Sequence, residues 1–319
     1  MLPSWSKRLT GTLFSRSRIG LHVGPNGIAA VRVVGRPAAP VLTAAVVQAV
    51  SPGLFRFSHR EPHILQPELF LEQLAVIRDQ LQMDDQRLAL ALPDSAGRIM
   101  LLDLEERWKN KAEACDMIRW KLKKSLALEP SDLHLDFQLV ARNEEGLSTV
   151  MAAIVSKRVI QQYEQLLEQA GLYADRIMFA TLALLQGFES RLAGEDDALF
   201  VSYFDQSLSI IIFADGVPSF YRSKALPGVR TGDGRLSMEL NSSLAVYRQR
   251  YPERRFGNLY CFAPAEDAVE FCGLAGELCE RTAQRLDPKQ WLASKDGTSG
   301  AHDSLYAVAA AAGSAIGGL

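Results

Sequence analysis

The sequence predicts an α/β protein composed of two duplicated domains. Residues 19–35 and 200–216 each contain an apolar strand, a short polar turn and a second apolar strand, so the same hairpin occurs once in each half of the chain. A third extended segment, a helix and a further apolar strand follow the first hairpin, and the second half repeats this order. Two copies of one β-β-β-α-β pattern indicate a duplicated folding unit.

The first domain is expected over residues 19–175. After the hairpin, its elements are expected to be an extended segment at 41–50, a helix at 68–81 and a strand at 88–92. Pro93, Asp94 and Ser95 follow this strand and predict a turn. The order of elements is that of a ribonuclease-H-like domain, and such α/β domains carry ligands at the carboxyl ends of their strands.

Residues 100 to about 156 are expected to form an insertion in the first domain. Its elements are expected to be a strand at 100–104, a helix at 107–126 and strands at 133–140 and 148–156. The buried face of the helix is predicted from helical spacing to contain Trp108, Ala112, Cys115, Ile118 and Leu122. Trp120 lies on nearly the opposite face beside lysines, so it is either an anchor for a partner or covered by the turn at 126–130.

The second domain is expected over residues 176–319, after a helix at 158–170 that ends at Gly171. Asp215 and Gly216 are a strong signal for a hairpin turn between two of its strands. Its other elements are expected to be a helix at 180–192, a strand at 217–222, a helix at 234–251, a strand at 258–262, a helix at 268–285, a loop at 287–303 and a closely packed core helix at 305–319.

Charge and composition exclude several classes of protein. The formal net charge of −2 argues against a protein that binds nucleic acid, because such a protein needs a concentrated positive field. The four cysteines form no CxxC pair, so we expect neither a zinc site nor a disulfide framework. The protein is therefore expected to lie in a reducing cytoplasm. No segment reaches the ~20 apolar residues of a membrane span. The basic residues 1–18 are expected to form either a helix on an anionic membrane surface or a solvated tail.

Four blocks of residues resemble the PilM-type proteins of type IV pilus assembly, which include the MshI-type proteins and have the actin-like ATPase fold. The blocks are 19–24, which matches I-G-x-D-x-G; 119–121 with Pro130, Asp136 and Phe137; 170–172, which matches A-G-L; and 239–248, which matches E-L-x-x-S-L-x-x-Y-R. The resemblance covers nearly the whole chain. It implies two actin-like domains around a nucleotide cleft, with an inserted subdomain in the first.

The sequence departs from the family pattern at the positions that would bind nucleotide and magnesium. His22 and Ala29 replace the Asp and Lys of the first loop, Ser202 to Phe204 replace the D-I-G of the second, and residues 262–265 replace a glycine run. Magnesium needs oxygen ligands that carry negative charge, which neither imidazole nor a hydroxyl supplies. Phe204 in place of glycine is expected to fill the cleft or to push the loop outward.

The two loops are therefore expected to be vestigial. Their remaining polar or small residues are Gly24, Asn26, Gly27, Ser207 and Ser209. A protonated His22 that faces a phosphate, or Asp205 in place of the missing carboxylate, would rescue nucleotide binding. We expect no metal and no cofactor, with ATP and magnesium disfavoured, and no enzyme activity.

The resemblance implies a cytoplasmic scaffold, peripheral to the inner membrane, that binds the cytoplasmic tail of a PilN-like single-pass membrane protein. It implies a tail site at Arg119, Trp120, Lys121, Asp136 and Phe137, and self-association stays open. One alternative is an active ATP-binding switch or ATPase of the same machinery.

A remote alternative is a small-molecule kinase, which needs a catalytic base in the first domain. Asp94 is the candidate base, although the sequence favours a turn residue there. His59, His63, His134 and His302 are expected to be surface or turn residues.

Overall fold

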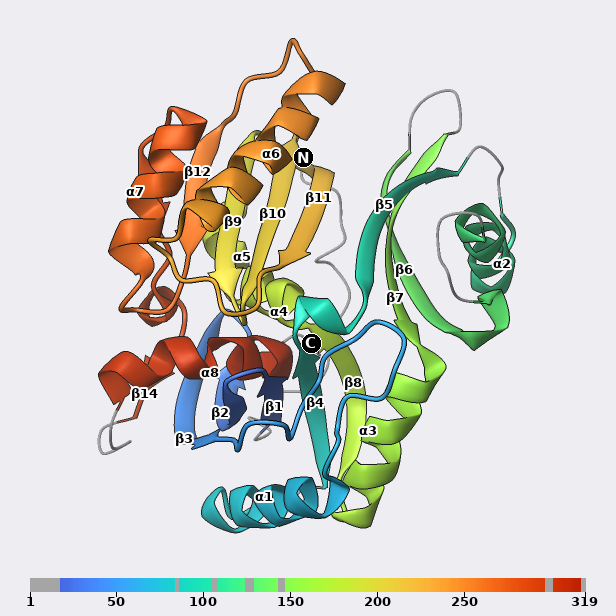
Figure 1. The fold of residues 1–319 in the computed structure, drawn as a ribbon, viewed down its shortest axis with the longest axis vertical. Coiled ribbons are helices and arrows are strands. Elements are labelled where there is room, and N and C mark those ends of the chain that lie inside the picture. The colour runs from blue at the N-terminus through green and yellow to red at the C-terminus, as the bar shows by residue number, and fades with distance from the viewer. Residues whose placement is uncertain are drawn as a thin grey trace.

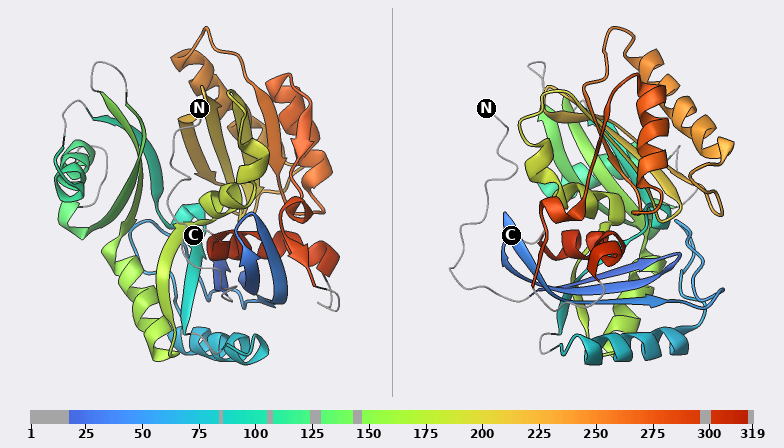
Figure 2. Two further views of the ribbon diagram at one scale, coloured as in Figure 1. Left: turned by 180° about the vertical axis from the view of Figure 1, so that it is seen from behind. Right: turned by 90° about the vertical axis from the view of Figure 1, so that its left-hand side faces the viewer.

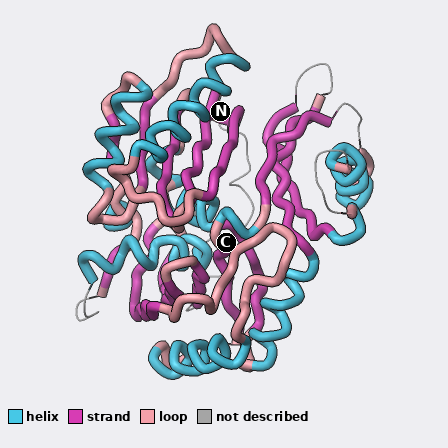
Figure 3. Tube along the Cα trace, viewed as in Figure 1, coloured by secondary structure: helices cyan, strands magenta, loops and turns pink. Residues whose placement is uncertain are grey.

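The computed structural model describes residues 18–83, 86–104, 108–123, 129–142, 147–295 and 301–316. Figure 1 shows a first lobe at the bottom, a second lobe above it, and a small lobe formed by the insertion at the side. Each of the three contains its own β-sheet, as the magenta strands of Figure 3 show. Residues 1–17, nearly all of the expected basic tail, lie outside the described residues.

The first lobe has a six-stranded sheet in the order β14-β3-β2-β1-β4-β8. Its elements are β1 (Arg18–Gly24), β2 (Gly27–Arg36), β3 (Ala39–Ala49), α1 (Pro67–Gln80), β4 (Arg87–Leu92), the short η2 (Asp94–Ala96), α3 (Lys157–Gln169), β8 (Tyr173–Phe179) and β14 (Ala293–Ser294). Strands β1, β2 and β3 form an antiparallel meander, and β4 pairs in parallel with β1 and with β8.

The second lobe repeats this topology in a five-stranded sheet, β11-β10-β9-β12-β13. Its elements are α4 (Ala180–Gly187), α5 (Glu189–Leu192), β9 (Ala198–Phe204), β10 (Ser207–Ala214), β11 (Val217–Ala225), α6 (Gly234–Arg250), β12 (Asn258–Phe262), α7 (Ala268–Cys279), β13 (Ala283–Arg285) and η4 (Pro288–Gln290), and helix α8 (Ala301–Ile316) follows them in the chain. Since β9, β10, β11, β12 and β13 occupy the places of β1, β2, β3, β4 and β8, the predicted duplication is confirmed.

The insertion is a three-stranded antiparallel sheet, β5-β7-β6, covered on one face by α2. Its elements are β5 (Arg98–Leu104), α2 (Lys111–Leu122), η3 (Pro130–Asp132), β6 (Leu133–Arg142) and β7 (Ser148–Ser156). Cys115, Ile118 and Leu122 of α2 pack against alternate residues of the three strands. Together these side chains form a hydrophobic core that is separate from the cores of the two larger lobes. Its strands lie within two residues of the expected ones, whereas α2 is shorter than the helix expected at 107–126.

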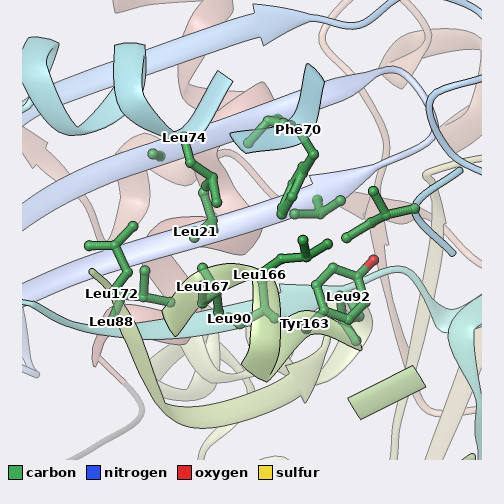
Figure 4. Packing of buried hydrophobic residues seen from close by; sticks show 14 of the residues in the cluster. Leu21, Phe70, Leu74, Leu88, Leu90, Leu92, Tyr163, Leu166, Leu167 and Leu172 are labelled. Atoms are coloured by element: carbon green, nitrogen blue, oxygen red, sulfur yellow. The ribbon is translucent and has the colours of Figure 1, made fainter. Parts of the chain in front are cut away.

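Alternation along the strands of the first lobe separates two packed layers. Leu21 and Leu90 point toward α1 and α3, where Figure 4 shows them among Phe70, Leu74 and Tyr163. On the other face the residues are small, and a Cβ on Gly20 would overlap the backbone of Ala311 in α8. Small side chains on this face let α8 lie close to β1, β2 and β4, so the sheet lies between α1 and α8 (Figure 2).

The structure corrects the expected domain boundary in two ways. Strand β8 continues to Phe179 in the first sheet, so the boundary at 175/176 falls inside a strand. Strand β14 and helix α8 follow the second lobe in sequence but pack on the first, because α8 supplies the apolar cover for that sheet. In turn, α4 follows the first sheet and packs against Phe200 and Phe262 of the second lobe.

Three local predictions were also wrong. The expected helix at 268–285 ends at Cys279, because Glu280 adopts a left-handed conformation and the chain then forms β13. The expected helix at 180–192 divides at Phe188 into α4 and α5. His63 is fully buried rather than on the surface, with its Nε2 donating to the Ser58 carbonyl at 2.7 Å.

Candidate functional site

The turns of the two duplicated hairpins touch each other between the lobes. His22, near the end of β1, donates a hydrogen bond from Nε2 to Asp205 Oδ2 at 2.6 Å, and both side chains are almost fully buried. A second contact at the exposed rim joins Gln206 Nε2 to Asn26 Oδ1 at 3.2 Å. The loops that the family pattern places on opposite sides of a nucleotide are therefore bonded directly to one another.

Local backbone geometry makes this contact attainable. Asp205 and Gln206 form the two-residue turn between β9 and β10, and both have positive φ, 53° and 55°. Two residues in the left-handed region are typical of a hairpin turn whose twist matches its strands. Gly24 is required on the opposite side, because a Cβ there would lie 2.7 Å from Asp205 Oδ1.

Aromatic rings fill the space behind the His22–Asp205 hydrogen bond. The Phe204 ring lies 5.4 Å from the His22 ring and 5.7 Å from that of Phe262, measured between centroids. Phe262 is fully buried and also contacts Phe188 and stacks on Tyr306 of α8. The expectation that Phe204 fills the cleft is therefore consistent with these contacts, which involve both lobes and α8.

The other predicted loop residues serve the protein's own structure. Ser207 Oγ donates to the Asp205 carbonyl at 3.4 Å, and Ser209 Oγ donates to Asp94 Oδ2 at 2.5 Å. Gly27 lies against the backbone of Gln48 in β3, where a side chain would not fit. Ser202, at the position of the family Asp, is buried and its hydroxyl has no hydrogen-bond partner among the described residues.

Asp94 is a site residue whose environment the sequence did not reveal. It follows β4 in η2, as the turn prediction required, but it is buried between the lobes. Its carboxylate accepts hydrogen bonds from the Thr181 N–H and the hydroxyls of Thr181, Ser209, Tyr221 and Ser223. Burial raises the pKa of Asp94, while the bonds from Ser209 and Thr181 lower it less strongly.

This arrangement does not fit magnesium and ATP. The carboxylate of Asp205, the one candidate replacement for the family Asp, is engaged by His22, and Asp94 is engaged by hydroxyl groups. Within the described ranges, no group of three or more His, Cys, Asp or Glu side chains is arranged to hold a metal ion. The rings of His22 and Phe204, 5.4 Å apart between centroids, lie against each other at the ends of β1 and β9.

The second predicted site lies on the insertion. Trp120 exposes 78% of its surface on α2, as a partner anchor would require. Residues 126–128 of the turn at 126–130, the alternative cover, lie outside the described residues. Beside it, Arg119 forms an ion pair with Asp116 at 2.9 Å, and Lys121 donates to the Asp103 carbonyl.

Asp136 and Phe137 of β6 lie in different surroundings from Trp120. Asp136 forms an exposed ion pair with Lys111 at 2.6 Å, which joins β6 to the start of α2. Phe137 packs edge-to-face on Trp108, whose other partner is the guanidinium of Arg142. Asp136 is therefore accessible, whereas Phe137 belongs to the core between α2 and the sheet.

No protein-family model and no curated protein matches this chain. Among solved structures, it is similar to a chain of the PilM-PilN type IV pilus biogenesis complex, with a TM-score of 0.77 and 19% identity over 95% of this chain and 98% of that chain. It is also similar to a Bacteroides thetaiotaomicron protein of unknown function with the actin-like ATPase fold, with a TM-score of 0.55 and 12% identity over 88% and 95% of the two chains. The fold is the actin-like ATPase fold.

A third similar structure is the cytoplasmic domain of EpsL, an inner membrane component of the type II secretion system of Vibrio cholerae. It matches with a TM-score of 0.50 and 13% identity, over 78% of this chain and 83% of that one. The resemblance to PilM-type proteins is thus confirmed at the level of the fold, and the closer relation to MshI-type proteins stays a prediction. Of the helices that the structure describes, none combines the length and apolar content that crossing a bilayer requires.

Proposed function

We propose that this protein is a cytoplasmic scaffold of a type IV pilus or related secretion assembly platform, and that it does not hydrolyse ATP. In this function it binds the cytoplasmic tail of a PilN-like inner-membrane protein. The observation that carries the proposal is the direct bond between His22 and Asp205 in a fold that otherwise follows a chain of the PilM-PilN complex along nearly its whole length.

The contacts between the lobes support a scaffold over an ATPase. An ATP-driven switch needs its two loops free to move apart around phosphates and a cation. Here a hydrogen bond between buried side chains, the ring of Phe204 and the Asp94 cluster all join the lobes. A rigid body with accessible surfaces on its inserted lobe suits a protein that holds others in place.

The proposed tail site lies on the insertion, around Trp120, Arg119 and the edge of β6. An exposed indole gives a large apolar contact area, and indole and guanidinium groups often dominate binding energy at protein interfaces. Strand β6 pairs only with β7 in the described sheet, so its outer edge can accept an extended segment by backbone hydrogen bonds. Asp136 belongs to this strand, and its exposed ion pair with Lys111 would fix the register of a charged tail.

The proposal is tested with a fluorescent peptide that contains the cytoplasmic tail of a PilN-like candidate partner. We expect saturable binding, weakened at least tenfold by Trp120→Ala and further by Arg119→Glu, a loss of about 1.4 kcal/mol or more. Met238→Ala is the matched control, because Met238 is 73% exposed on α6 of the second lobe. Equal affinity of all variants would mean that the tail binds elsewhere on the protein. Failure of the unmodified protein to bind the tail would exclude the PilN-like tail as its partner.

A further inference from the structure

Asp94 lies in the contact between the two larger lobes with no cation beside it. It belongs to η2 of the first lobe and exposes 7% of its surface, and η2 packs on β10 and β11 of the second lobe. In the part of the chain that the structure describes, no Lys, Arg or His side chain forms an ion pair with Asp94. Because an unpaired buried charge is costly, a carboxyl group in such a place is more stable when it keeps its proton.

The hydroxyl groups around Asp94 are placed to accept a proton from it. Hydroxyl oxygens surround its Oδ2 atom at 2.5 Å (Thr181), 2.5 Å (Ser209), 3.3 Å (Tyr221) and 3.5 Å (Ser223). Ser209 Oγ also lies 2.9 Å from Ser223 Oγ, and its single proton serves only one of its two short contacts. If Asp94 donates to Ser209, then Ser209 is free to donate to Ser223, and both contacts become hydrogen bonds.

The titratable groups that face Asp94 do not favour its ionised form. Burial raises the pKa of Asp94 most, the hydrogen bonds that it accepts lower it, and the like charge of Asp205 in the β9–β10 turn raises it further. His22 of β1 is hydrogen-bonded to Asp205 and not to Asp94. Tyr221 of β11 stays a neutral phenol, because burial raises its pKa. The contacts from α4 and β10 come from Thr and Ser hydroxyls, which do not titrate.

We infer that Asp94 keeps its proton at neutral pH in the folded protein, and that the protonated side chain is a pH-sensitive contact between the two lobes. In this form it joins η2 to β10 and β11 through hydroxyl groups and adds no buried charge. In alkaline solution, hydroxide takes the proton and becomes water, and the only bond that breaks is the O–H bond of the acid. The carboxylate then needs water, which reaches it when η2 separates from the second sheet.

Infrared spectroscopy of the full-length protein tests the protonation state. A protonated carboxyl group has a C=O stretching band that carboxylates lack. We expect the difference spectrum between the unmodified protein and Asp94→Asn at neutral pH to contain this band, and Asp94→Ser to give the same result. The matched control is Asp215→Asn, which removes a carboxyl group from a side chain that is 82% exposed and should leave the band unchanged.

Unfolding in urea at several pH values gives a second measurement. Since the folded-state pKa of Asp94 is raised above 3.8, its contribution to stability is present below about pH 4 and is lost as the pH rises toward the folded-state pKa. Relative to Asp94→Asn, the folding equilibrium constant of the unmodified protein should therefore fall about tenfold for each pH unit in that interval. The comparison cancels the other titrating groups, which both proteins share.

Three outcomes would overturn the inference. If the difference spectrum lacks the acid band at neutral pH, or if the stability ratio stays constant above about pH 4, Asp94 is ionised in the folded protein. Failure of both Asp94 variants to fold would also contradict it, because an uncharged Asp94 should tolerate an uncharged replacement. These measurements use no nucleotide and no tail peptide, so their outcome is independent of the proposed function.

Discussion

His22 and Asp205 are 183 positions apart in the chain, and their buried side chains meet in a 2.6 Å hydrogen bond that joins the two lobes. In the PilM-type pattern these loops would face nucleotide, and the structure instead connects them to each other. This pair therefore serves as a structural contact at the place where the fold otherwise provides a nucleotide site, and its strength can be measured directly.

A double-mutant cycle of His22→Ala and Asp205→Ala should give a coupling energy of about 2 kcal/mol, because a hydrogen bond to a charged group in a buried site contributes this much. The measurement is the free energy of unfolding in urea for the four proteins. The exposed pair Asn26 and Gln206 is the control, and its cycle should give less than about 0.5 kcal/mol. Equal coupling in the two pairs would contradict a special role for the buried one.

Magnesium and ATP should not stabilise the folded protein. A ligand present at a hundred times its Kd raises the free energy of unfolding by about 2.7 kcal/mol, so ~1 mM nucleotide would reveal a Kd of roughly 10 micromolar. We expect a change below about 0.5 kcal/mol, because His22 and Phe204 occupy the approach to both loops. Thermal unfolding with and without nucleotide measures this, and calorimetric binding tighter than roughly 10 micromolar would restore the ATP-switch alternative.

His63 should make the fold sensitive to acid. Burial lowers the pKa of His63 from 6.5 to about 4, outweighing the hydrogen bond to Ser58, which raises it. Because the folded-state pKa is the lower one, this contribution to stability is present above about pH 6.5 and is lost as the pH falls toward 4. The difference amounts to about 3 kcal/mol at most.

The check is urea unfolding at several pH values, with His63→Gln as the comparison. The variant should be less stable at neutral pH, since Tyr163 loses its neighbouring ring, but the stability difference should shrink between pH 6.5 and 4. A difference that stays constant across this range would show that His63 titrates in the folded protein as it does in the unfolded chain.

Phe262→Ala should destabilise the protein by about 3 to 5 kcal/mol, since it removes a fully buried ring that contacts Phe188, Phe204 and Tyr306.

Trp120→Ala, in contrast, should change the free energy of unfolding by less than about 0.5 kcal/mol, because that side chain is exposed. Both values come from urea unfolding. A large loss of stability in Trp120→Ala would mean that the indole has a structural contact. Weaker partner binding by this variant could then not be assigned to a lost contact with the partner.

The parts of the fold that local pattern specifies were predicted well. The Asp215-Gly216 turn forms the β10–β11 hairpin, with both residues at positive φ, and α6 and β12 lie within one residue of their expected bounds. Strands β8 and β13 were missed because they are at sheet edges, where few of their residues are buried and alternation is weak. Pairing with β4 and β12, rather than local preference, makes them strands.

The sequence predicted which ligand groups the candidate site lacks, but not which side-chain contacts it contains. The sequence showed that His22, Ser202 and Phe204 could not hold magnesium, since that follows from residue type alone. It could not show that Asp205 bonds to His22, or that Asp94 gathers hydroxyls from Thr181 and Ser209, because these partners are 87 to 183 positions apart. Such contacts depend on how the lobes close, which no local pattern records.

Helix α4 follows the first sheet but packs on the second lobe, and α8 follows the second lobe but packs on the first sheet. This exchange affects how the protein can be divided into fragments for study. A fragment that stops at residue 175 would leave bare the sheet surface that Val308, Ala311 and Ala312 normally shield, and would end partway through β8. The complementary fragment would carry α8 with no sheet to rest on. Neither piece should stay in solution alone, whereas mixing the two during refolding should regenerate the intact molecule.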